Sequence, residues 1–423
     1  MVPLAAIVFF NVSGGPYGIE DMVPVFGPGL ALILLVLTPI FWSLPVSLAM
    51  SELASAMPDE GGYVTWTTRA FGPFWGFQVG WWSWIDSFVD VAVYPALFVE
   101  YVAYWCPALT PTERWLLALA FIAVLTTLNL IGVRPTGRAA VVLSVLALVP
   151  VAILVVMAVP GMTAQPWRPL VAEGQTVLSG VGLGLAVVMW NYSGWDTPST
   201  VLGETVAPER AFRRALLLSL PLITAAYVLP VGAALGVGAV PWTAWTTGTL
   251  PVVAQAIGGT TLGHAIAAGA VVSTAGLFLA LLLTNSRLPY VLARDGMMPQ
   301  WLAGVHPRFG TPWPAVLVSS ALYAAFAAFS FKDLIVLNIW LYSLALVVEL
   351  AAFVYLRISA PGMPRPWRVP GGLPTACVVA GCPAVFALAA MATAGALNTA
   401  AGIIAALTGP LMWALMRRPR RRA

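Results

Sequence analysis

The sequence is poor in charged residues, and this shortage limits the classes of protein to which it can belong. Asp, Glu, Lys and Arg together make up 9% of the residues, whereas 60% are hydrophobic. Soluble globular domains carry about 25% charged residues, so a water-soluble fold is excluded. The net charge of +4 is small and gives no indication of nucleic-acid binding.

Cysteine and histidine are scarce as well. The three cysteines, Cys106, Cys377 and Cys382, are an odd number on apolar segments, so a disulfide framework is not expected. His264 and His306 have no companions at metal-ligand spacing, and we expect no metal site. Neither a nucleophile and base nor a metal cluster is available at membrane depth. The sequence therefore argues against an enzyme, with no catalytic residues and no cofactor.

Long apolar runs are abundant instead. A helix needs about 20 apolar residues to cross roughly 30 Å of hydrocarbon. Mean hydropathy is +0.90, and suitable windows suggest about twelve spans. They lie at 2–27, 29–51, 73–105, 113–131, 138–160, 176–203, 212–238, 261–286, 312–330, 333–357, 374–396 and 398–416. The sequence thus predicts an all-α, polytopic protein embedded in a lipid bilayer.

The basic residues are distributed unevenly about these spans. If the arginine-rich end at 417–423 is cytoplasmic, every basic residue lies on that side except Arg114, Arg168 and Lys332. Lys and Arg near span ends usually stay in the cytoplasm. We therefore predict a multi-pass protein of the plasma or inner membrane, with both termini cytoplasmic and a basic tail at 417–423.

Two stretches interrupt apolar helices with the same Asn-x-Ser-Gly core, one at 11–18 and the other at 191–196. Glycine and proline disrupt helices, and backbone groups freed at membrane depth require protein or a water-filled cavity around them. The chain reaches the first break from the cytoplasm and the second from outside, so the two broken spans run antiparallel. Such a pair points to a transporter's binding site. The alternative is two ordinary kinks in a packed bundle.

The breaks divide the chain into related halves. Residues 1–160 and 176–357 would form two inverted repeats of five spans each, and 374–416 would add two helices to a single transporter domain at 1–416. In the first break, the backbone N–H groups from Ser13 to Gly18 are expected to form a cradle for an anion or polar group, with Ser13, Gly14 and Gly15 at its centre. Backbone carbonyls near Asn191 would accept hydrogen bonds from an ammonium group.

Three acidic residues lie near the middle of the membrane. Asp86 and Asp90 are about 20 and 25 Å into the third span, with Tyr94 on the same helix face, and Asp196 is at the sixth-span break. Basic residues fall in loops or at span ends, so none neutralises these carboxylates, which are functional-site candidates. We predict that Asp86, Asp90 and Asp196 are proton-coupling candidates. A helix N-cap for Asp196 and a polar tether for Asp90 are the structural alternatives.

Other acids have simpler expected roles. Glu349 in the tenth span is expected to make a structural or gating contact. Glu204 is expected to pair with nearby loop arginines at 210, 213 and 214. Aromatic residues crowd the two breaks, and an aromatic ring over a cation contributes about 0.5 to 2 kcal/mol. Among them we choose Tyr17 and Trp190 as substrate contacts, and the Trp190 indole also as a lid.

Several motifs together give the chain a resemblance to a known family. They extend from Phe9 to about Pro370 and comprise Phe9–Gly18, Gly61–Val64, Phe71–Gly76, Gly80–Trp84, Asp90, Tyr94–Pro95, Trp190–Asn191, Trp195–Asp196, Gly203–Glu204, Ala293–Met297, Gly310–Pro312, Leu341–Tyr342 and Arg365–Pro370. With these motifs the chain resembles the amino acid-polyamine-organocation superfamily. Within it, the chain is similar to the polyamine:proton symporters of plants and trypanosomatids.

This resemblance implies a five-plus-five inverted-repeat fold of the LeuT type, alternating access, and amine uptake driven by protons. It also implies that Trp190 and Asp196 match the aromatic gate and the acidic position of arginine and putrescine carriers. Asp196 is shorter than the glutamate expected there, and Asp86 stands where plant members are expected to have a small residue. No lysine lies in the fifth span to imitate a sodium ion.

The sequence therefore predicts a secondary active transporter that takes up polyamines or cationic amino acids by proton symport. The substrate-binding residues are predicted to be Ser13, Gly14, Gly15, Tyr17, Asp90, Trp190, Asn191 and Asp196. A neutral amino acid permease or an exchanger is the alternative within transport, and a substrate-binding membrane receptor is the alternative from another class.

Overall fold

The structure, a computed structural model, describes residues 2–174, 176, 188–328 and 331–416. Within these residues it is made of helices and loops. The first half contains α1 (Val2–Val12), α2 (Met22–Phe26), α3 (Pro28–Thr38), a π-helical turn (Pro39–Ser43), α4 (Leu44–Ala56), α5 (Tyr63–Phe71), α6 (Pro73–Asp90), α7 (Val93–Val102), α8 (Pro111–Leu130) and α9 (Val133–Ala158).

The second half contains a 3-10 helix, η3 (Thr197–Glu204), followed by α11 (Pro208–Val237), α12 (Thr249–Asn285), α13 (Arg287–Arg294), α14 (Trp313–Phe326), α15 (Phe331–Ser359), α16 (Gly372–Thr393) and α17 (Ala396–Met416). The tail at 417–423 and the start of the predicted sixth span, at 177–187, lie outside the described residues. The all-α, polytopic prediction is confirmed.

Local sequence signals mark the helix starts. Thr110 and Glu113 form a reciprocal capping box at the start of α8, where Pro111 is the first helical residue. The starts of α3 and α6 share a Gly-Pro pair, in which Gly27 and Gly72 adopt φ of 85° and 89°. Such φ values suit glycine, and proline is pre-organised for the first helical turn.

Eight helices in the described part of the chain are long and apolar enough to cross a membrane. They agree with predicted windows, including 138–160 for α9 and 374–396 for α16. The remaining four windows are those that the structure breaks, shortens or describes only in part: 2–27, 73–105, 176–203 and 312–330. A total of twelve spans therefore stays a prediction.

The predicted third span is divided into two helices. α6 ends at Asp90 and α7 begins at Val93. Pro95 explains the division, because a proline has no N–H and its ring clashes with the carbonyl four residues earlier. The sequence had suggested one continuous helix here, and the interruption falls directly after an acidic residue.

Both predicted breaks are present in the described residues. α1 ends at Val12, and helical structure resumes at Met22. After the sixth-span helix ends near Asn191, Gly194 adopts φ of 89°. A Cβ atom at Gly194 would collide with the backbone carbonyl oxygen of Asn11. The two breaks therefore lie directly against each other, and only glycine fits at this contact.

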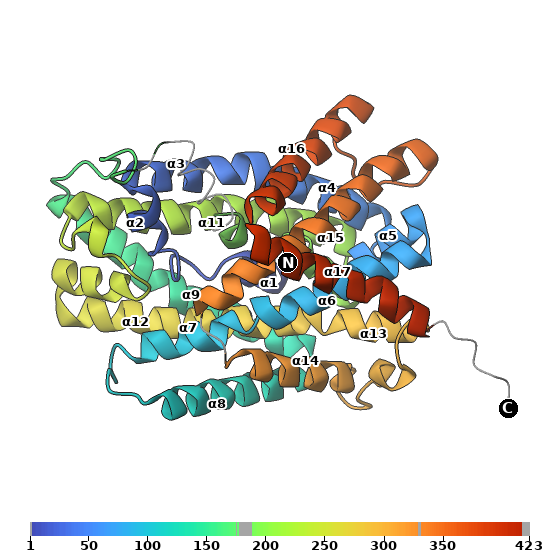
Figure 1. The fold of residues 1–423 in the computed structure, drawn as a ribbon, viewed down its shortest axis with the longest axis horizontal. Helices are drawn as coiled ribbons and strands as arrows, with labels where there is room; N and C mark the ends of the chain where they lie inside the picture. The colour runs from blue at the N-terminus through green and yellow to red at the C-terminus, as the bar shows by residue number, and fades with distance from the viewer. Residues whose placement is uncertain (1, 175, 177–187, 329–330, 417–423) are drawn as a thin grey trace.

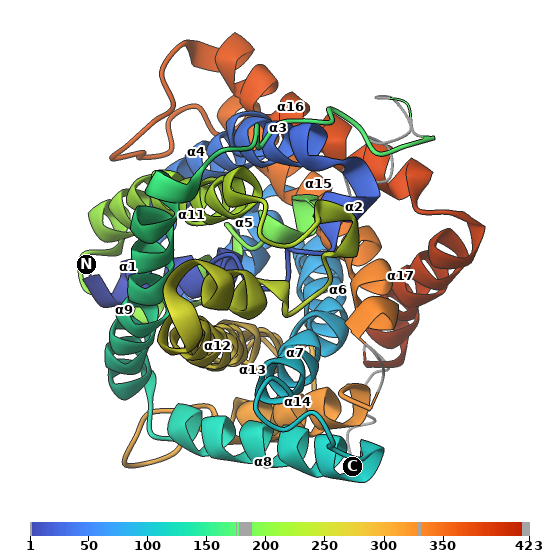
Figure 2. The ribbon, with the colours of Figure 1, turned by 90° about the vertical axis from the view of Figure 1, so that its left-hand side faces the viewer.

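The helices run mostly along the long axis of the molecule, and Figure 2 looks along many of them. α1 packs against α9, α11 and α12, which brings the first break to the middle of the bundle. α8 and α14 lie side by side at one edge in both views. α16 and α17 lie at the periphery and pack on α15.

Candidate functional site

A buried cavity lies where the two breaks meet α6, α12 and α15. Its lining includes all three predicted aspartates, Asp86, Asp90 and Asp196. Asn11 and Gly194, one from each break, also line it. Tyr94 joins Asp86 and Asp90 in the lining. It does so from the next helix, α7, and not from the same helix as predicted.

Each aspartate accepts a hydrogen bond from a different side chain. The Trp190 indole N–H donates to Asp90 over 3.0 Å, the Tyr342 hydroxyl donates to Asp196 over 2.7 Å, and the Asn338 amide donates to Asp86 over 3.2 Å. Among the described residues, no Lys, Arg or His lines the cavity. All of these donors are neutral, so the site holds several acids and no compensating cation of its own.

α15 supplies two of the three donors. Asn338 and Tyr342 are four residues apart, which places them on one helix face. The Tyr342 hydroxyl also accepts a hydrogen bond from the Gly194 N–H, 2.9 Å away. The sequence analysis missed Asn338 and treated Tyr342 only as part of a motif. Polar residues at a four-residue spacing in the otherwise apolar window 333–357 were the available signal.

A second cavity adjoins the first. The predicted residues Ser13, Gly14, Gly15, Tyr17 and Asn191 line this second cavity rather than the one with the aspartates. Val12, Tyr94 and Trp190 line both cavities. The rings of Tyr94 and Trp190 are stacked at 6.5 Å between centroids, with 18° between their planes. The predicted substrate residues thus fall into two groups that meet at this aromatic pair.

The predicted cradle of free N–H groups is wrong in part, because the protein occupies several of those groups itself. The Ser13 N–H donates to the Phe9 carbonyl, and the Gly15 N–H donates to the Ser13 hydroxyl over 3.1 Å. The Gly18 N–H donates to the Glu20 carboxylate over 2.8 Å. Glu20 is fully buried and also accepts a hydrogen bond from the Tyr101 hydroxyl.

The first carbonyls of the second break also have donors. The Asn191 carbonyl accepts a hydrogen bond from the Tyr227 hydroxyl over 2.9 Å. The Tyr192 carbonyl accepts from the indole N–H groups of Trp42 and Trp195. Aromatic side chains therefore hold the broken backbone, and the aspartates provide the acceptors that face the cavity.

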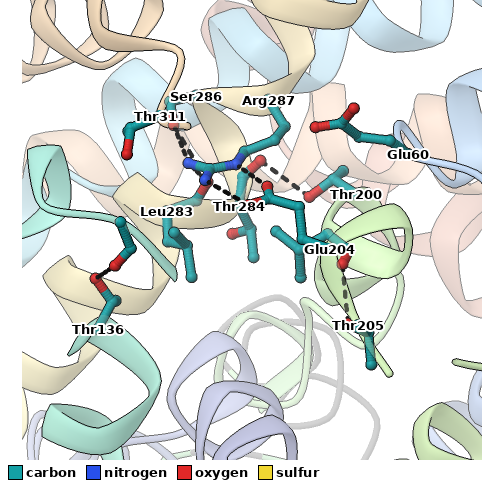
Figure 3. Close-up of polar contacts among 12 residues, drawn as sticks. Glu60, Thr136, Thr200, Glu204, Thr205, Leu283, Thr284, Ser286, Arg287 and Thr311 are labelled. Carbon is teal, nitrogen blue, oxygen red and sulfur yellow. Dashed lines mark hydrogen bonds and ion pairs between the residues drawn. The ribbon is translucent and has the colours of Figure 1, made fainter. Parts of the chain in front are cut away.

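A polar network joins the first break to the end of α12. Thr284 donates to the Asn11 side-chain oxygen over 2.8 Å, and its carbonyl accepts from the Thr200 hydroxyl of η3. Close by, the fully buried Arg287 guanidinium donates to Glu204 over 2.9 Å, as Figure 3 shows. The expected pairing of Glu204 with nearby loop arginines is wrong, since its partner is 83 residues away along the chain.

Glu60 belongs to the same region, outside the membrane-spanning segments (Figure 3). Its carboxylate forms an ion pair of 3.2 Å with Arg294. Burial raises the pKa of Glu60 and the charge of Glu204 adds to this, while Arg287 and Arg294 oppose it. The cluster connects the loop before α5 with η3 and α13.

A helical membrane protein in which two broken segments enclose a buried acidic cavity has the construction of a secondary transporter. The sequence profile of the amino acid permease family matches residues 5–415, and the chain belongs to this family. It is a transporter rather than an enzyme, as its family and relatives indicate.

The relatives include transporters of plants and bacteria. The chain is 35% identical to "Polyamine transporter RMV1" of Arabidopsis thaliana over 88% of its own length and 76% of the relative's. It is 36% identical to "Polyamine transporter PUT1" of Oryza sativa subsp. japonica over 91% and 71% of the two lengths. An uncharacterized transporter of Mycobacterium tuberculosis is 30% identical over 71% and 66%.

Proposed function

We propose that this transporter takes up polyamines by proton symport through alternating access. One observation supports this proposal above all: three carboxylates line a buried cavity without a basic residue among the described lining residues. A polyamine carries several ammonium groups, which would balance these carboxylates. The names of the plant relatives agree with such a substrate.

Each aspartate would bind substrate while it keeps its present donor. A carboxylate has two oxygens and about four acceptor positions, so the hydrogen bonds from Trp190, Tyr342 and Asn338 leave acceptor positions for an ammonium group. Asp86 and Asp90 are one helical turn apart, about 6 Å along the axis. Neighbouring ammonium groups of one extended polyamine would reach both the α6 carboxylates and Asp196.

The stacked Tyr94 and Trp190 rings are proposed to form a gate between the two cavities. An amine that entered through the second cavity would pass Tyr17 and then meet these rings, whose faces attract cations. Ser13, Gly14, Gly15 and Asn191 would line that entry. In this arrangement Trp190 both orients Asp90 and separates the entry from the acidic cavity.

Amino acids are the second candidate class of substrate. Their carboxylate would need free donors in the first break, whereas Gly15 and Gly18 N–H groups already donate to Ser13 and Glu20. This favours an amine without a carboxylate. The test can also reveal transport of cationic amino acids, or of a neutral amino acid by a permease or exchanger. It can likewise reveal a receptor that binds without transport.

The wider architecture belongs to the same proposal. We assign one transporter domain to 1–416, with inverted repeats at 1–160 and 176–357 and added helices at 374–416. The arginine distribution supports cytoplasmic termini and a location in the plasma or inner membrane. Asp86, Asp90 and Asp196 are the proposed proton-coupling residues within the cavity.

Radiolabelled putrescine or spermidine uptake into proteoliposomes, under an inward proton gradient, tests the proposal. We expect accumulation that a protonophore abolishes and that excess leucine does not inhibit. Arginine serves as the competitor that separates polyamines from cationic amino acids. Transport of leucine or alanine without polyamine uptake would overturn the substrate assignment, and binding without accumulation would favour a receptor.

A further inference from the structure

Glu349 differs from the other acids of the protein interior. Its side chain is 1% exposed, and neither carboxylate oxygen has a hydrogen-bond partner among the described residues. By contrast, the buried carboxylates of Glu20, Asp86 and Asp196 accept hydrogen bonds. Buried ionised carboxylates are strongly disfavoured without a partner, so an unpartnered one requires an explanation.

Glu349 continues the polar face of α15 that serves the cavity. Asn338, Tyr342 and Glu349 follow one another at spacings of four and seven residues, which places them on one face of the helix. Asn338 holds Asp86 and Tyr342 holds Asp196. Glu349 lies two turns beyond Tyr342, about 10 Å along the axis. It does not line the cavity itself.

Electrostatic interactions connect Glu349 with the cavity. The Glu349 carboxyl lies close enough to Asp196 for the charge of Asp196 to act on it, and Asp196 lines the cavity. A cation bound at Asp196 therefore changes the field at Glu349. The acid lies behind the cavity wall and within reach of the charge that the substrate brings.

The nearest arginines along α15 and its following loop are engaged elsewhere. Arg357 pairs with Glu52 and donates to the Val369 and Gly372 carbonyls. Arg365 also pairs with Glu52, over 3.3 Å. The ionisable groups on the elements packed against α15 are Glu52 on α4, Tyr63 and Arg69 on α5, Asp86 and Asp90 on α6, Tyr94, Glu100 and Tyr101 on α7, and Cys377 and Cys382 on α16, with none in α17.

We propose that Glu349 is a proton-binding site of the transporter, which carries its proton while Asp196 holds the substrate ammonium and releases it when water reaches the Ser359 end of α15. This rests on the proton-driven amine uptake proposed above, and it adds an acid outside the cavity to the three aspartates. In that state the negative charge of Asp196 is balanced by the ammonium group, and Glu349 is neutral. Little unbalanced charge is then left in the membrane. Substrate and proton would then move together.

Glu349→Gln fixes the residue in a neutral form of nearly the same shape. In proteoliposomes at equal pH, we expect exchange of labelled for unlabelled putrescine to stay near the wild-type rate, because exchange needs no proton release. Under an inward proton gradient, we expect accumulation to fall at least about tenfold. Glu349→Asp, which keeps a titratable group, should retain gradient-driven accumulation. Wild-type accumulation by Glu349→Gln, or the same loss in both variants, would overturn the proposal.

A second measurement needs no substrate. Infrared difference spectra between acidic and alkaline pH should show a carboxyl band in the wild type that Glu349→Gln lacks and Glu349→Asp shifts. Identical bands in all three proteins would overturn the assignment. If the glutamine variant does not fold, the band of Glu349→Asp is compared with that of the wild type, and an unshifted band would overturn the assignment. If the wild type carries no amine, the proposed function fails, while the infrared band still decides whether Glu349 binds a proton.

Discussion

Replacing Asp196 with asparagine tests the central electrostatic argument. Asn keeps the volume of the side chain and an oxygen that can accept the hydrogen bond from Tyr342. This hydrogen bond is 2.7 Å long with Asp196. The substitution therefore removes the charge and little else. Loss of one partner of a buried, hydrogen-bonded charge pair costs about 2 to 5 kcal/mol. We expect the lower end, because Asp86 and Asp90 still line the cavity.

About 2 kcal/mol corresponds to a Kd about 30-fold weaker. Titration calorimetry of spermidine binding to purified Asp196→Asn would measure this directly. Asp59→Asn is the matched control, since the same substitution then falls on an exposed carboxylate outside the spans. Spermidine binding to Asp196→Asn within about threefold of the wild type would refute the idea that this carboxylate holds an ammonium.

Three further predictions concern other parts of the molecule. Trp190→Phe leaves Asp90 without its indole donor, so the unfolding temperature should fall more for the empty carrier than for the spermidine-bound one; an equal fall would separate Asp90 from the substrate. Glu52→Gln leaves the buried Arg357 without its carboxylate and should cost about 3 to 5 kcal/mol of stability, seen as a lower unfolding temperature; a value equal to wild type would contradict this. Cys106 is exposed, and with the other cysteines changed to alanine it should react with an impermeant maleimide from outside intact cells; labelling only after the cells are opened would reverse the orientation.

The sequence was sufficient for the fold class because its main signals are strong and local. Apolar windows located the long helices, and the Asn-x-Ser-Gly interruptions located both breaks. It was insufficient where one residue competed with a long apolar pattern. Pro95 divides the third span after Asp90, although the surrounding hydrophobicity predicted a single helix.

The acidic residues of the candidate site could be predicted from the sequence, but their hydrogen-bond donors could not. Asp86, Asp90 and Asp196 were recognisable as unneutralised acids within apolar windows. Their donors come from Trp190 and from α15, between 100 and 252 residues away along the chain. No local pattern records which donor meets which acceptor at such separations. The same limit explains why Glu204 was assigned to neighbouring arginines instead of Arg287.

Glu20 has a consequence for the backbone that follows the first break. The Gly18 N–H has two acceptors within the protein, the Glu20 carboxylate at 2.8 Å and the Tyr101 hydroxyl at 3.0 Å. The Tyr101 hydroxyl in turn donates to Glu20, so the three groups form a closed triangle that joins this loop to α7. The turn after the first break is therefore fixed by buried side chains of the protein and needs no ligand to order it.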